Sequence, residues 1–387
     1  MVKPVYLDYS ATTPCDERVV EDMLPYFTEY FGNASSRSHR FGWQAIAAVE
    51  QAGERVAALI NVQPREIIFT SGATEACNLA LRGVYEMYGV KGKHIITTKT
   101  EHKAVLDTCK ILEKKGATVS YIDVDKNGLI DLNQLETLVR SDTILVSIMY
   151  ANNETGVIQP VKEIGAICKK HNTLFFCDAT QAVGKIPVDV QALGIDLMSF
   201  SAHKIYGPKG VGALYIRSRN PRVKLTPQIT GGGQQENIRS GTLNTPGIVG
   251  FGKACAICNE EMQDESKRLS HLLNQLKTGL LQISGTFLNG HSDLRLPNVL
   301  NISFEGLNSS QLISALNQSI ALSSGSACTS GSLDPSYVLS AMHIETSLAK
   351  AALRFSIGRF TTKEDIDFVI NEVTEKVNKL RKELPLI

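Results

Sequence analysis

The sequence carries almost no net charge and no long hydrophobic run. Forty lysines and arginines stand against 39 aspartates and glutamates, a formal net charge of +1, so no overall field draws the chain to nucleic acid or to an anionic membrane. No apolar stretch approaches the roughly 20 residues that cross a bilayer, and the first nine residues lack a charged stretch followed by a hydrophobic one. These absences predict a cytoplasmic protein without direct nucleic-acid or membrane partners.

The eight cysteines lack the paired spacing of small secreted disulfide scaffolds. They lie mostly in apolar segments, which predicts reduced thiols. Cys255 and Cys258 have the CxxC spacing of a redox pair or of half a zinc site. No second such pair and no close histidine pair completes four ligands, and both residues lie in a helix-like apolar stretch. Buried structural thiols are the favoured interpretation, and we expect no resident metal.

Strand-like and helix-like segments alternate from about residue 43 to residue 260. With 387 residues, 43% of them hydrophobic, the chain can bury a large core and form two domains. This alternation is typical of an α/β protein whose mainly parallel sheet is covered by helices. The expected strands are residues 66–70, 94–98, 118–122, 143–149, 173–177, 197–200 and 211–216.

Two helix patterns lead to specific expectations. Trp43 shares a helical spacing with Val56 and Leu59, which predicts that it is a core residue. After residue 260 the pattern changes to a polar helix, short strands and a final helix, where Thr361 and Glu364 fit a capping box. We therefore expect one large sheet domain and one smaller domain.

Lys204 lies in an unusual place for a lysine, directly after an expected strand and before a glycine-rich turn in SAHKIYGPKG. Most lysines lie on the solvated surface, but a loop at a strand end can hold an amine in a cleft with a lowered pKa, ready to form a Schiff base. Two neighbours favour this second interpretation. Asp178 closes the apolar run 173–177, where it can keep a pyridine nitrogen protonated, and Gln181 could donate to the phenolate oxygen of the same ring.

Three further strand ends carry polar residues, each with a simpler alternative. The segment 71–75 is a small-residue turn that can bind a phosphate, or an ordinary helix cap. His102 can stack on a cofactor ring and move protons, or it is a loop histidine. Asn152 and Asn153 are turn formers by default, although Asn153 could bond to the cofactor ring. Because ligands bind α/β sheets at the carboxyl ends of the strands, the combination favours one cofactor site.

The chain closely resembles the cysteine desulfurases of the NifS and IscS type, which are fold-type-I pyridoxal-phosphate enzymes related to class-V aminotransferases. The resemblance runs from YLDYSATTP at residues 6–14 to RFSIGRFTT at residues 354–362. Its most specific parts are DATQ at 178–181, SAHKIYGP at 201–208 and SSGSACTS at 323–330, in this order.

The resemblance implies an architecture and a set of cofactor contacts. A large domain of residues 15–260, with a mainly parallel seven-stranded sheet, binds pyridoxal phosphate, and residues 1–14 and 261–387 form a smaller α+β domain with a mobile active-site loop. Lys204 carries the cofactor, Asp178 faces its ring nitrogen and His102 stacks on the ring. The remaining contacts are Gln181 at the phenolate oxygen and, at the phosphate, Ala73, Thr74, Ser201, His203 and Thr242, while Asn153 is kept as a further cofactor-binding residue at the ring.

Thr242 is the residue that bears on whether the site needs a second subunit. By its own sequence it is a turn residue in a glycine-rich segment. The resemblance implies that it reaches across from a partner, so that each site needs a homodimer.

Cys328 lies in a run of small residues, 323–331, which cannot pack a core and is therefore flexible or exposed. A lone cysteine in such a loop is more often incidental, because reactivity needs an environment that favours the thiolate. The resemblance makes Cys328 catalytic together with Lys204 and His102: Cys328 attacks the sulfur of L-cysteine, and its loop carries the persulfide outward. The resemblance also implies that Cys328 can ligate an iron–sulfur cluster transiently, in which case the cluster is not a resident cofactor.

Arg354, in an apolar strand-like segment, offers a planar fork for a carboxylate, or else forms an ion pair. The resemblance assigns it to the substrate carboxylate, with Asn33 assisting. The implied products are L-alanine and a persulfide whose sulfur passes to an iron–sulfur scaffold protein or to a sulfur carrier for tRNA thiolation. Two rivals stay open: an aminotransferase or selenocysteine lyase of the same fold, and a non-enzymatic scaffold on that fold.

Overall fold

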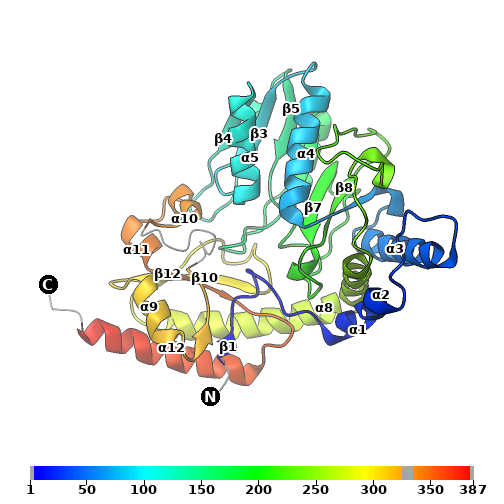
Figure 1. Cartoon of the computed structure of the whole chain (residues 1–387). Helices are drawn as coiled ribbons and strands as arrows, with labels where there is room; N and C mark the ends of the chain where they lie inside the picture. Colours follow the sequence, from blue (N-terminus) through cyan, green and yellow to red (C-terminus); the bar gives the residue numbers. More distant parts are fainter. Residues whose placement is uncertain (1–3, 325–333, 384–387) are drawn as a thin grey trace.

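The centre of the fold is a seven-stranded sheet with the order β2-β8-β7-β6-β5-β3-β4 (Figure 1). The computed structural model describes residues 4–324 and 334–383. Strand β8 is antiparallel to its neighbours β2 and β7, and the other pairs are parallel. The α/β class and the seven expected strands are confirmed, with ends shifted by two residues at most. The strands are β2 (Ile67–Thr70), β3 (His94–Thr98), β4 (Thr118–Ile122), β5 (Thr143–Ser147), β6 (Leu174–Asp178), β7 (Leu197–Ser201) and β8 (Gly212–Ile216).

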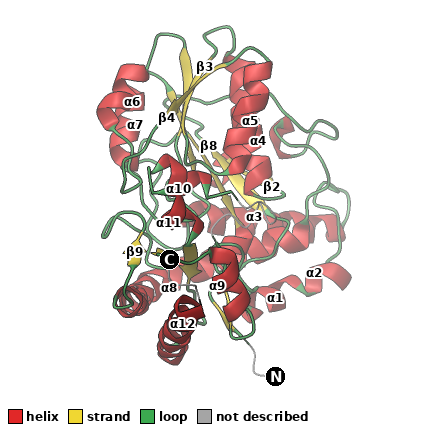
Figure 2. Cartoon of the chain, turned by 90° about the vertical axis from the view of Figure 1, so that its left-hand side faces the viewer, coloured by secondary structure: helices red, strands yellow, loops and turns green. Residues whose placement is uncertain are grey.

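Helices cover both faces of this sheet, and Figure 2 shows α4 and α5 on one side of it and α6 and α7 on the other. On β6, Phe175 and Cys177 belong to one core and Phe176 to the other, as the twofold alternation of a strand requires. Strands that are buried on both faces read as continuous apolar runs, which is why the sequence reveals them. The helices that precede or cover the sheet are α1 (Glu17–Met23), α2 (Pro25–Thr28), α3 (Arg40–Leu59), α4 (Ala73–Tyr88), α5 (Lys103–Lys114), α6 (Leu132–Leu138) and α7 (Val161–Lys170).

A second core lies against a three-stranded antiparallel sheet of order β12-β10-β9. Helix α8 (Thr245–Leu281) runs from the large sheet into this second core, so the predicted division after residue 260 falls inside one helix. The two domain ranges stay a prediction. The elements here are β1 (Val5–Tyr6), β9 (Thr286–Leu288), β10 (Val299–Phe304), α9 (Ser309–Leu316), β11 (Ile320–Ala321), α10 (Tyr337–Ala341), α11 (Thr346–Lys350), β12 (Ala352–Ser356) and α12 (Lys363–Glu383).

Long helices in this fold do not imply a membrane. Helix α8 has 37 residues, of which the segment 245–258 is mostly apolar and the segment 260–268 mostly charged. Among the described residues, no helix is both long enough and apolar enough to cross a bilayer.

The expectation that Trp43 is a core residue was wrong. Its side chain is 56% exposed, and its Nε1 donates to the main-chain oxygen of Arg37 over 2.7 Å. The buried face of α3 is formed by small residues such as Ala45 and Ala52, which let α3 approach α8 closely: a Cβ on Gly252 would lie 2.6 Å from Ala52 Cα. Trp43 precedes Ala45 by two residues, about 200° around a helix, and therefore points away from that face.

The capping box of the final helix forms one residue later than predicted. Thr362 N donates to Asp365 Oδ2 over 2.9 Å, and Asp365 N donates to Thr362 Oγ1 over 3.1 Å. Thr361 is buried instead, where its Oγ1 accepts from Gly358 N over 3.0 Å. Both pairs have the same spacing, so the sequence pattern alone does not choose between them.

Candidate active site

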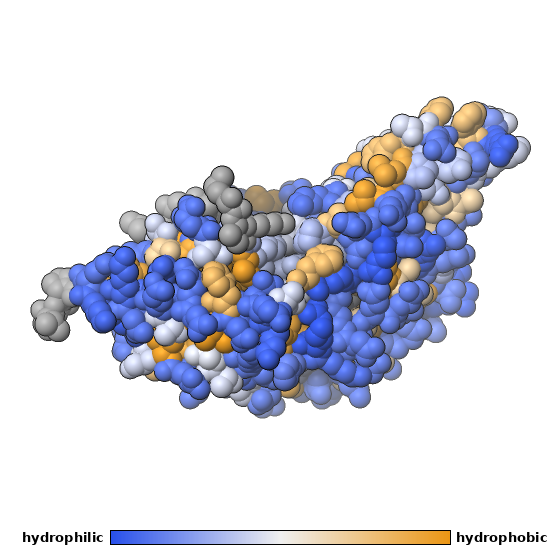
Figure 3. Space-filling model, turned by 90° about the horizontal axis from the view of Figure 1, so that it is seen from below, coloured by the Kyte–Doolittle hydropathy of each residue, from blue (hydrophilic) through white to orange (hydrophobic). Residues whose placement is uncertain are grey.

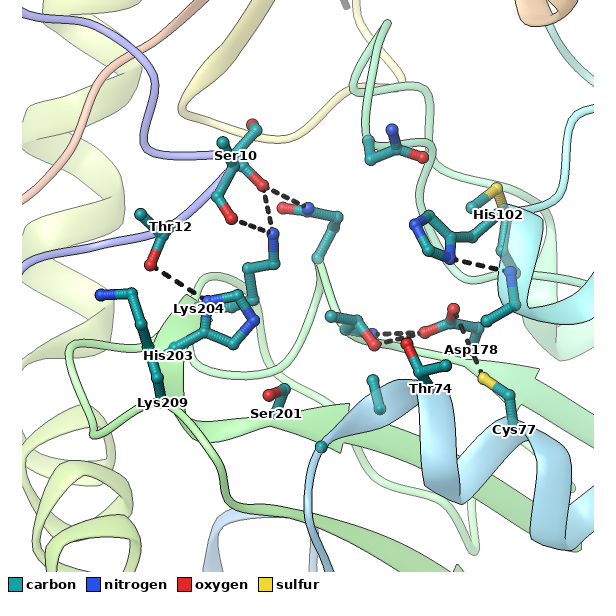
Figure 4. A pocket seen from close by; sticks show the side chains of 18 of the residues that line it. Ser10, Thr12, Thr74, Cys77, His102, Asp178, Ser201, His203, Lys204 and Lys209 are labelled. Atoms are coloured by element: carbon teal, nitrogen blue, oxygen red, sulfur yellow. Dashed lines mark hydrogen bonds between the residues drawn. The ribbon is translucent and has the colours of Figure 1, made fainter. Parts of the chain in front are cut away.

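A cavity of about 580 Å³ lies at the carboxyl ends of β6 and β7, beside the start of α4 (Figure 4). The N-terminal segment 10–12 and β12 also contribute to its walls. It therefore brings together residues more than 300 positions apart in the sequence. Among the residues predicted for the site, those that line it are Ala73, Thr74, His102, Asn153, Asp178, Gln181, Ser201, His203, Lys204 and Arg354.

Lys204 reaches the cavity from the end of a strand, as predicted. It ends the short 3-10 helix η2 (Ala202–Lys204), which directly follows β7. Its Nζ donates to the main-chain oxygens of Ser10 over 2.5 Å and Ala11 over 2.7 Å. Carbonyl oxygens accept but cannot donate, so the N-terminal segment holds the amine by accepting its hydrogen bonds.

Asp178 is the last residue of β6 and is 6% exposed. Its Oδ1 accepts from the main-chain N–H of Thr180 over 3.0 Å and from the Thr180 hydroxyl over 2.5 Å, and its Oδ2 lies 3.9 Å from Cys77 Sγ. Two donors on one oxygen fix the carboxylate at the floor of the cavity. Burial, and then the charge of Asp178, raise the pKa of the fully buried Glu101 well above its usual value.

The start of α4 is suited to an anion. Gly72, with φ +152°, is the N-cap of this helix, and no side chain caps the first turn. Uncapped N–H groups and the helix dipole attract negative charge. The nearby carboxylate of Glu75 is held by Ser71 N over 2.8 Å and by Arg239 Nε over 2.7 Å, so its charge is neutralised.

Ser201 and His203 lie on the wall that faces this helix start. The Nδ1 of His203 is 3.1 Å from Thr12 Oγ1. Burial, followed by the charges of Lys204 and Lys209, lowers the pKa of His203 from 6.5 to about 4. The imidazole is therefore neutral at pH 7, and the surrounding lysines give this wall the positive charge that a phosphate would need.

His102 lies on the opposite side of the cavity from Lys204, and Asn153 also lines the cavity. His102 is the N-cap of α5, and its Nδ1 accepts from Ala104 N over 3.1 Å, which assigns the ring proton to Nε2. Asn152 is the turn former, because its Oδ1 accepts from the two following main-chain N–H groups over 2.9 and 3.0 Å. Asn153 lines the cavity, and its buried Oδ1 has no hydrogen-bond partner among the described residues.

Arg354 enters the cavity from β12, with its side chain 3% exposed. Its Nη1 donates to Asn153 O over 3.0 Å and its Nη2 to Asp8 Oδ1 over 2.7 Å. The predicted fork is therefore present at the site, but one of its nitrogens also pairs with a carboxylate of the protein. A substrate carboxylate has to share Arg354 with Asp8.

The sequence reasoning missed the contributions of Asp8, Ser10 and Thr12. All three lie in the quoted segment YLDYSATTP, but their partners are at least 170 residues away in the chain. The segment marked the resemblance without giving these residues a role.

Two of the predicted site residues that the structure describes are not brought together with the others. Asn33 Oδ1 accepts from Ser35 N over 2.8 Å, and Thr242 is exposed in a loop; neither lines the cavity. The contact of Thr242 with a partner subunit stays a prediction. Cys328 lies outside the described residues.

Cys255 and Cys258 are buried free thiols in α8, as predicted. Burial raises the pKa of Cys258 to about 12. Within residues 4–324 and 334–383, no three His, Cys, Asp or Glu side chains are grouped as a metal ion would require. These two thiols therefore act as small core residues.

Comparison with known proteins identifies the family. The class-V aminotransferase family model matches residues 5–369. Cysteine desulfurase IscS of Salmonella paratyphi B (strain ATCC BAA-1250 / SPB7) is 53% identical over 388 residues, which cover all of this chain and 96% of that protein. The chain belongs to the cysteine desulfurases of the class-V aminotransferase family.

Solved structures agree with this assignment. A NifS-like protein superposes with a TM-score of 0.91 at 42% identity, over 97% of this chain and all of that one. SspA in complex with cysteine superposes with a TM-score of 0.82 at 36% identity, over 92% of this chain and all of that one. The predicted family and its fold-type-I architecture are confirmed. Members of this family depend on pyridoxal phosphate.

Proposed function

We propose that this cysteine desulfurase binds pyridoxal phosphate, converts L-cysteine to L-alanine and transfers the sulfur to Cys328 as a persulfide. The observation that carries the proposal is the convergence of Lys204, Asp178 and Arg354 on one cavity. An amine, a fixed carboxylate and a guanidinium are the groups that this reaction needs for attachment, electronic activation and substrate binding. The solved relative described in complex with cysteine supports the choice of substrate.

The described residues fit the cofactor. The uncapped start of α4 with Ala73 and Thr74, together with Ser201 and His203, offers N–H and side-chain donors for its phosphate. The buried carboxylate of Asp178 fits a protonated ring nitrogen. When bound, pyridoxal phosphate withdraws electrons from the α-carbon of the amino acid attached to it.

Other side chains complete the cofactor site. His102 lies where it can stack on the ring, and Gln181 and Asn153 offer amide groups to the phenolate oxygen. Lys204 is the point of attachment. The Oδ1 of Asn153 has no hydrogen-bond partner among the described residues, so it can accept from a donor of a ligand, whereas only the NH₂ group of this amide can donate to the phenolate oxygen.

The same residues then handle the substrate and its protons. Arg354 binds the carboxylate of cysteine through charge-assisted hydrogen bonds; the assistance of Asn33 is proposed by family analogy alone, since Asn33 does not line the cavity. The amine of Lys204 would remove the α-proton, and His102, which carries its ring proton on Nε2, would move a further proton.

The sulfur transfer follows from the chemistry of a thiolate. The thiolate of Cys328 attacks the substrate sulfur and forms a sulfur–sulfur bond while the carbon–sulfur bond breaks. The electron pair of the broken bond stays with the carbon fragment, which takes a proton and leaves as L-alanine. The persulfide on Cys328 is the form in which sulfur leaves the site.

A homodimer is part of the proposal, with Thr242 of each chain contributing to the phosphate site of its partner. Large apolar side chains are exposed around α2 and the start of α3: Leu24, Phe27, Phe31, Phe41 and Trp43 are each 48–64% exposed. Figure 3 shows apolar side chains gathered on the end of the molecule that these segments form. Patches of this kind mark protein interfaces, and a second copy of this chain is the occupant that would also deliver Thr242.

The onward route of the sulfur is proposed by family analogy. An iron–sulfur scaffold protein and a sulfur carrier for tRNA thiolation are the acceptors we propose. We also propose a cytoplasmic location, because the sequence predicts reduced thiols.

A product assay tests the proposal. The purified protein with pyridoxal phosphate, L-cysteine and a dithiol such as dithiothreitol, which reduces the persulfide and releases its outer sulfur as sulfide, should form sulfide and alanine in equal amounts. Lys204→Ala should form neither, and Cys328→Ala should form neither while it still binds the cofactor. Cys15→Ala, which removes a half-exposed thiol outside the cavity, is the matched control and should keep both products. Consumption of cysteine without sulfide would favour an aminotransferase, and full activity of Cys328→Ala would favour a lyase.

A further inference from the structure

Lys185 lies next to Gln181 on the turn that follows β6, outside the lining of the cavity. Its Nζ donates to Gln181 Oε1 over 2.7 Å. The other end of the same amide, Nε2, donates to Ser10 O over 3.0 Å, and Ser10 O also accepts from Lys204 Nζ over 2.5 Å. A chain of hydrogen bonds therefore joins Lys185 to Lys204 through the side chain of Gln181.

The fold fixes the position of Lys185. The preceding residue, Gly184, has φ +74°, and a Cβ there would lie 2.5 Å from Ile205 Cγ2 and 2.9 Å from Cys258 Sγ. Only glycine tolerates both this conformation and this contact. Because Ile205 directly follows Lys204, the turn that carries Lys185 is packed against the segment that carries the catalytic amine.

The contact with Lys185 decides which way the Gln181 amide points. The two ends of an amide have nearly the same shape, but one end only accepts hydrogen bonds and the other only donates. Lys185 Nζ donates to the carbonyl end here, and in its protonated form it has donors and no acceptor, so it can bind no other end. The NH₂ end is then left toward the cavity side, where it can donate to a negatively charged oxygen.

A positive charge on Lys185 costs free energy, because the site is buried and lies near other cations. Packing alone therefore does not explain a lysine at this position. Burial, followed by the charges of Lys204 and Arg354, lowers the pKa of Lys185 from 10.5 to about 7, while Cys258 and Glu265 of α8 act in the opposite direction. A neutral side chain of similar length would fill the same space without that repulsion.

We propose that Lys185 is a positioning residue that orients the amide of Gln181 so that its NH₂ group binds the phenolate oxygen of the cofactor. This inference rests on the proposed function. With Lys185 removed, only the bond from Gln181 Nε2 to Ser10 O still orients the amide, so its carbonyl oxygen can turn toward the phenolate oxygen more often, which replaces an attraction by a repulsion.

The test uses the complete protein loaded with pyridoxal phosphate and compares wild type, Lys185→Met and Lys185→Arg. Two readouts other than turnover are the dissociation constant of the cofactor and the pH at which its visible absorption changes. In Lys185→Met the dissociation constant should rise by about tenfold, the effect of one charge-assisted hydrogen bond, and the spectral midpoint should move up by about one pH unit. Lys185→Arg keeps the donors and should behave as wild type, and so should Lys162→Met on the exposed face of α7.

A double-mutant cycle separates positioning from a plain charge effect. If Lys185 acts through Gln181, Lys185→Met should add nothing to the spectral shift already caused by Gln181→Met. A full additional shift in that background, or wild-type behaviour of Lys185→Met alone, would overturn the inference.

Two outcomes need separate treatment. Thermal unfolding shows whether Lys185→Met folds, and Lys185→Gln replaces it if it does not. Glutamine can bond to either end of the Gln181 amide, so the same spectral shift is expected. Absence of that shift counts against the proposal. If wild type does not bind the cofactor at all, the proposed function fails and this inference fails with it. A failure of Lys185 alone leaves cofactor binding by wild type intact.

Discussion

Arg354 Nη2 and Asp8 Oδ1 lie 2.7 Å apart, and they join β12, whose guanidinium we propose binds the substrate, to the N-terminal segment. The Arg354 side chain is 3% exposed and that of Asp8 is 20% exposed. A buried guanidinium needs a counter-charge, and Asp8 supplies it before substrate arrives. The substrate carboxylate therefore competes with Asp8 for one cation.

This competition predicts opposite effects of two substitutions on the KM for L-cysteine. Arg354→Gln removes the cation, and KM should rise by about 10- to 100-fold, the range of a charge-assisted hydrogen bond. Asp8→Asn keeps an acceptor but removes the competing charge, so KM should fall or stay the same. Steady-state kinetics measure both, and an equal rise of KM in the two variants would contradict the competition.

His203 predicts a pH dependence of stability in the cofactor-free protein. The pKa of His203 is about 4 in the folded chain, against 6.5 for an ordinary histidine, the value taken for the unfolded chain. Between these pH values the unfolded chain binds a proton at His203 that the folded chain does not, so this contribution to stability is complete above about pH 6.5 and is lost as the pH falls toward 4. His203→Gln should flatten the decline of the melting temperature across that interval. An unchanged slope in His203→Gln would show that other groups cause the decline.

Gly72 predicts a cofactor-binding defect caused by backbone strain. A residue with a Cβ adopts φ near +152° only at a cost of about 1–3 kcal/mol, whereas the Cβ itself would meet only Ser201 Oγ, at 3.8 Å. Gly72→Ala should therefore fold but bind pyridoxal phosphate about tenfold more weakly. Gly53→Ala in α3, where a Cβ meets no atom within 4 Å, is the matched control. Equal cofactor affinity in both variants would argue against a role for the Gly72 conformation.

The exposed apolar end predicts the oligomeric state. Phe27→Glu combined with Phe31→Glu should convert a dimer to a monomer and weaken cofactor binding, because Thr242 of the partner is lost. Val90→Glu introduces the same charge at another exposed apolar residue and should leave the dimer intact. Sedimentation velocity measures the mass, and a dimer that survives the double substitution would place the interface elsewhere.

Much of the site could be predicted because its residues follow strands. Asp178, Lys204 and His102 each lie at or just after the carboxyl end of a buried parallel strand, and that rule alone directs them to one edge of the sheet. The resemblance supplied what the rule does not: which donors face the phosphate, and which distant arginine joins the site.

The remaining contacts could not be predicted because they depend on packing between distant segments. Asp8 meets Arg354 across 346 positions, and Lys185 gains its role only through a turn packed against Ile205. Trp43 fits a helical spacing, yet the buried face of α3 was selected by the close approach of α8 to small residues. Periodicity identifies a helix, but the neighbour that packs against it decides which face is buried.

The most direct test of the account is a single turnover without any sulfur acceptor. The protein loaded with pyridoxal phosphate is mixed with one equivalent of L-cysteine, its thiols are alkylated, and the cysteine-containing peptides are weighed by mass spectrometry. The account predicts one extra sulfur atom on Cys328, none on Cys15, and one alanine for each persulfide. Alanine released with free sulfide while Cys328 stays unmodified, or extra sulfur on another cysteine, would contradict it.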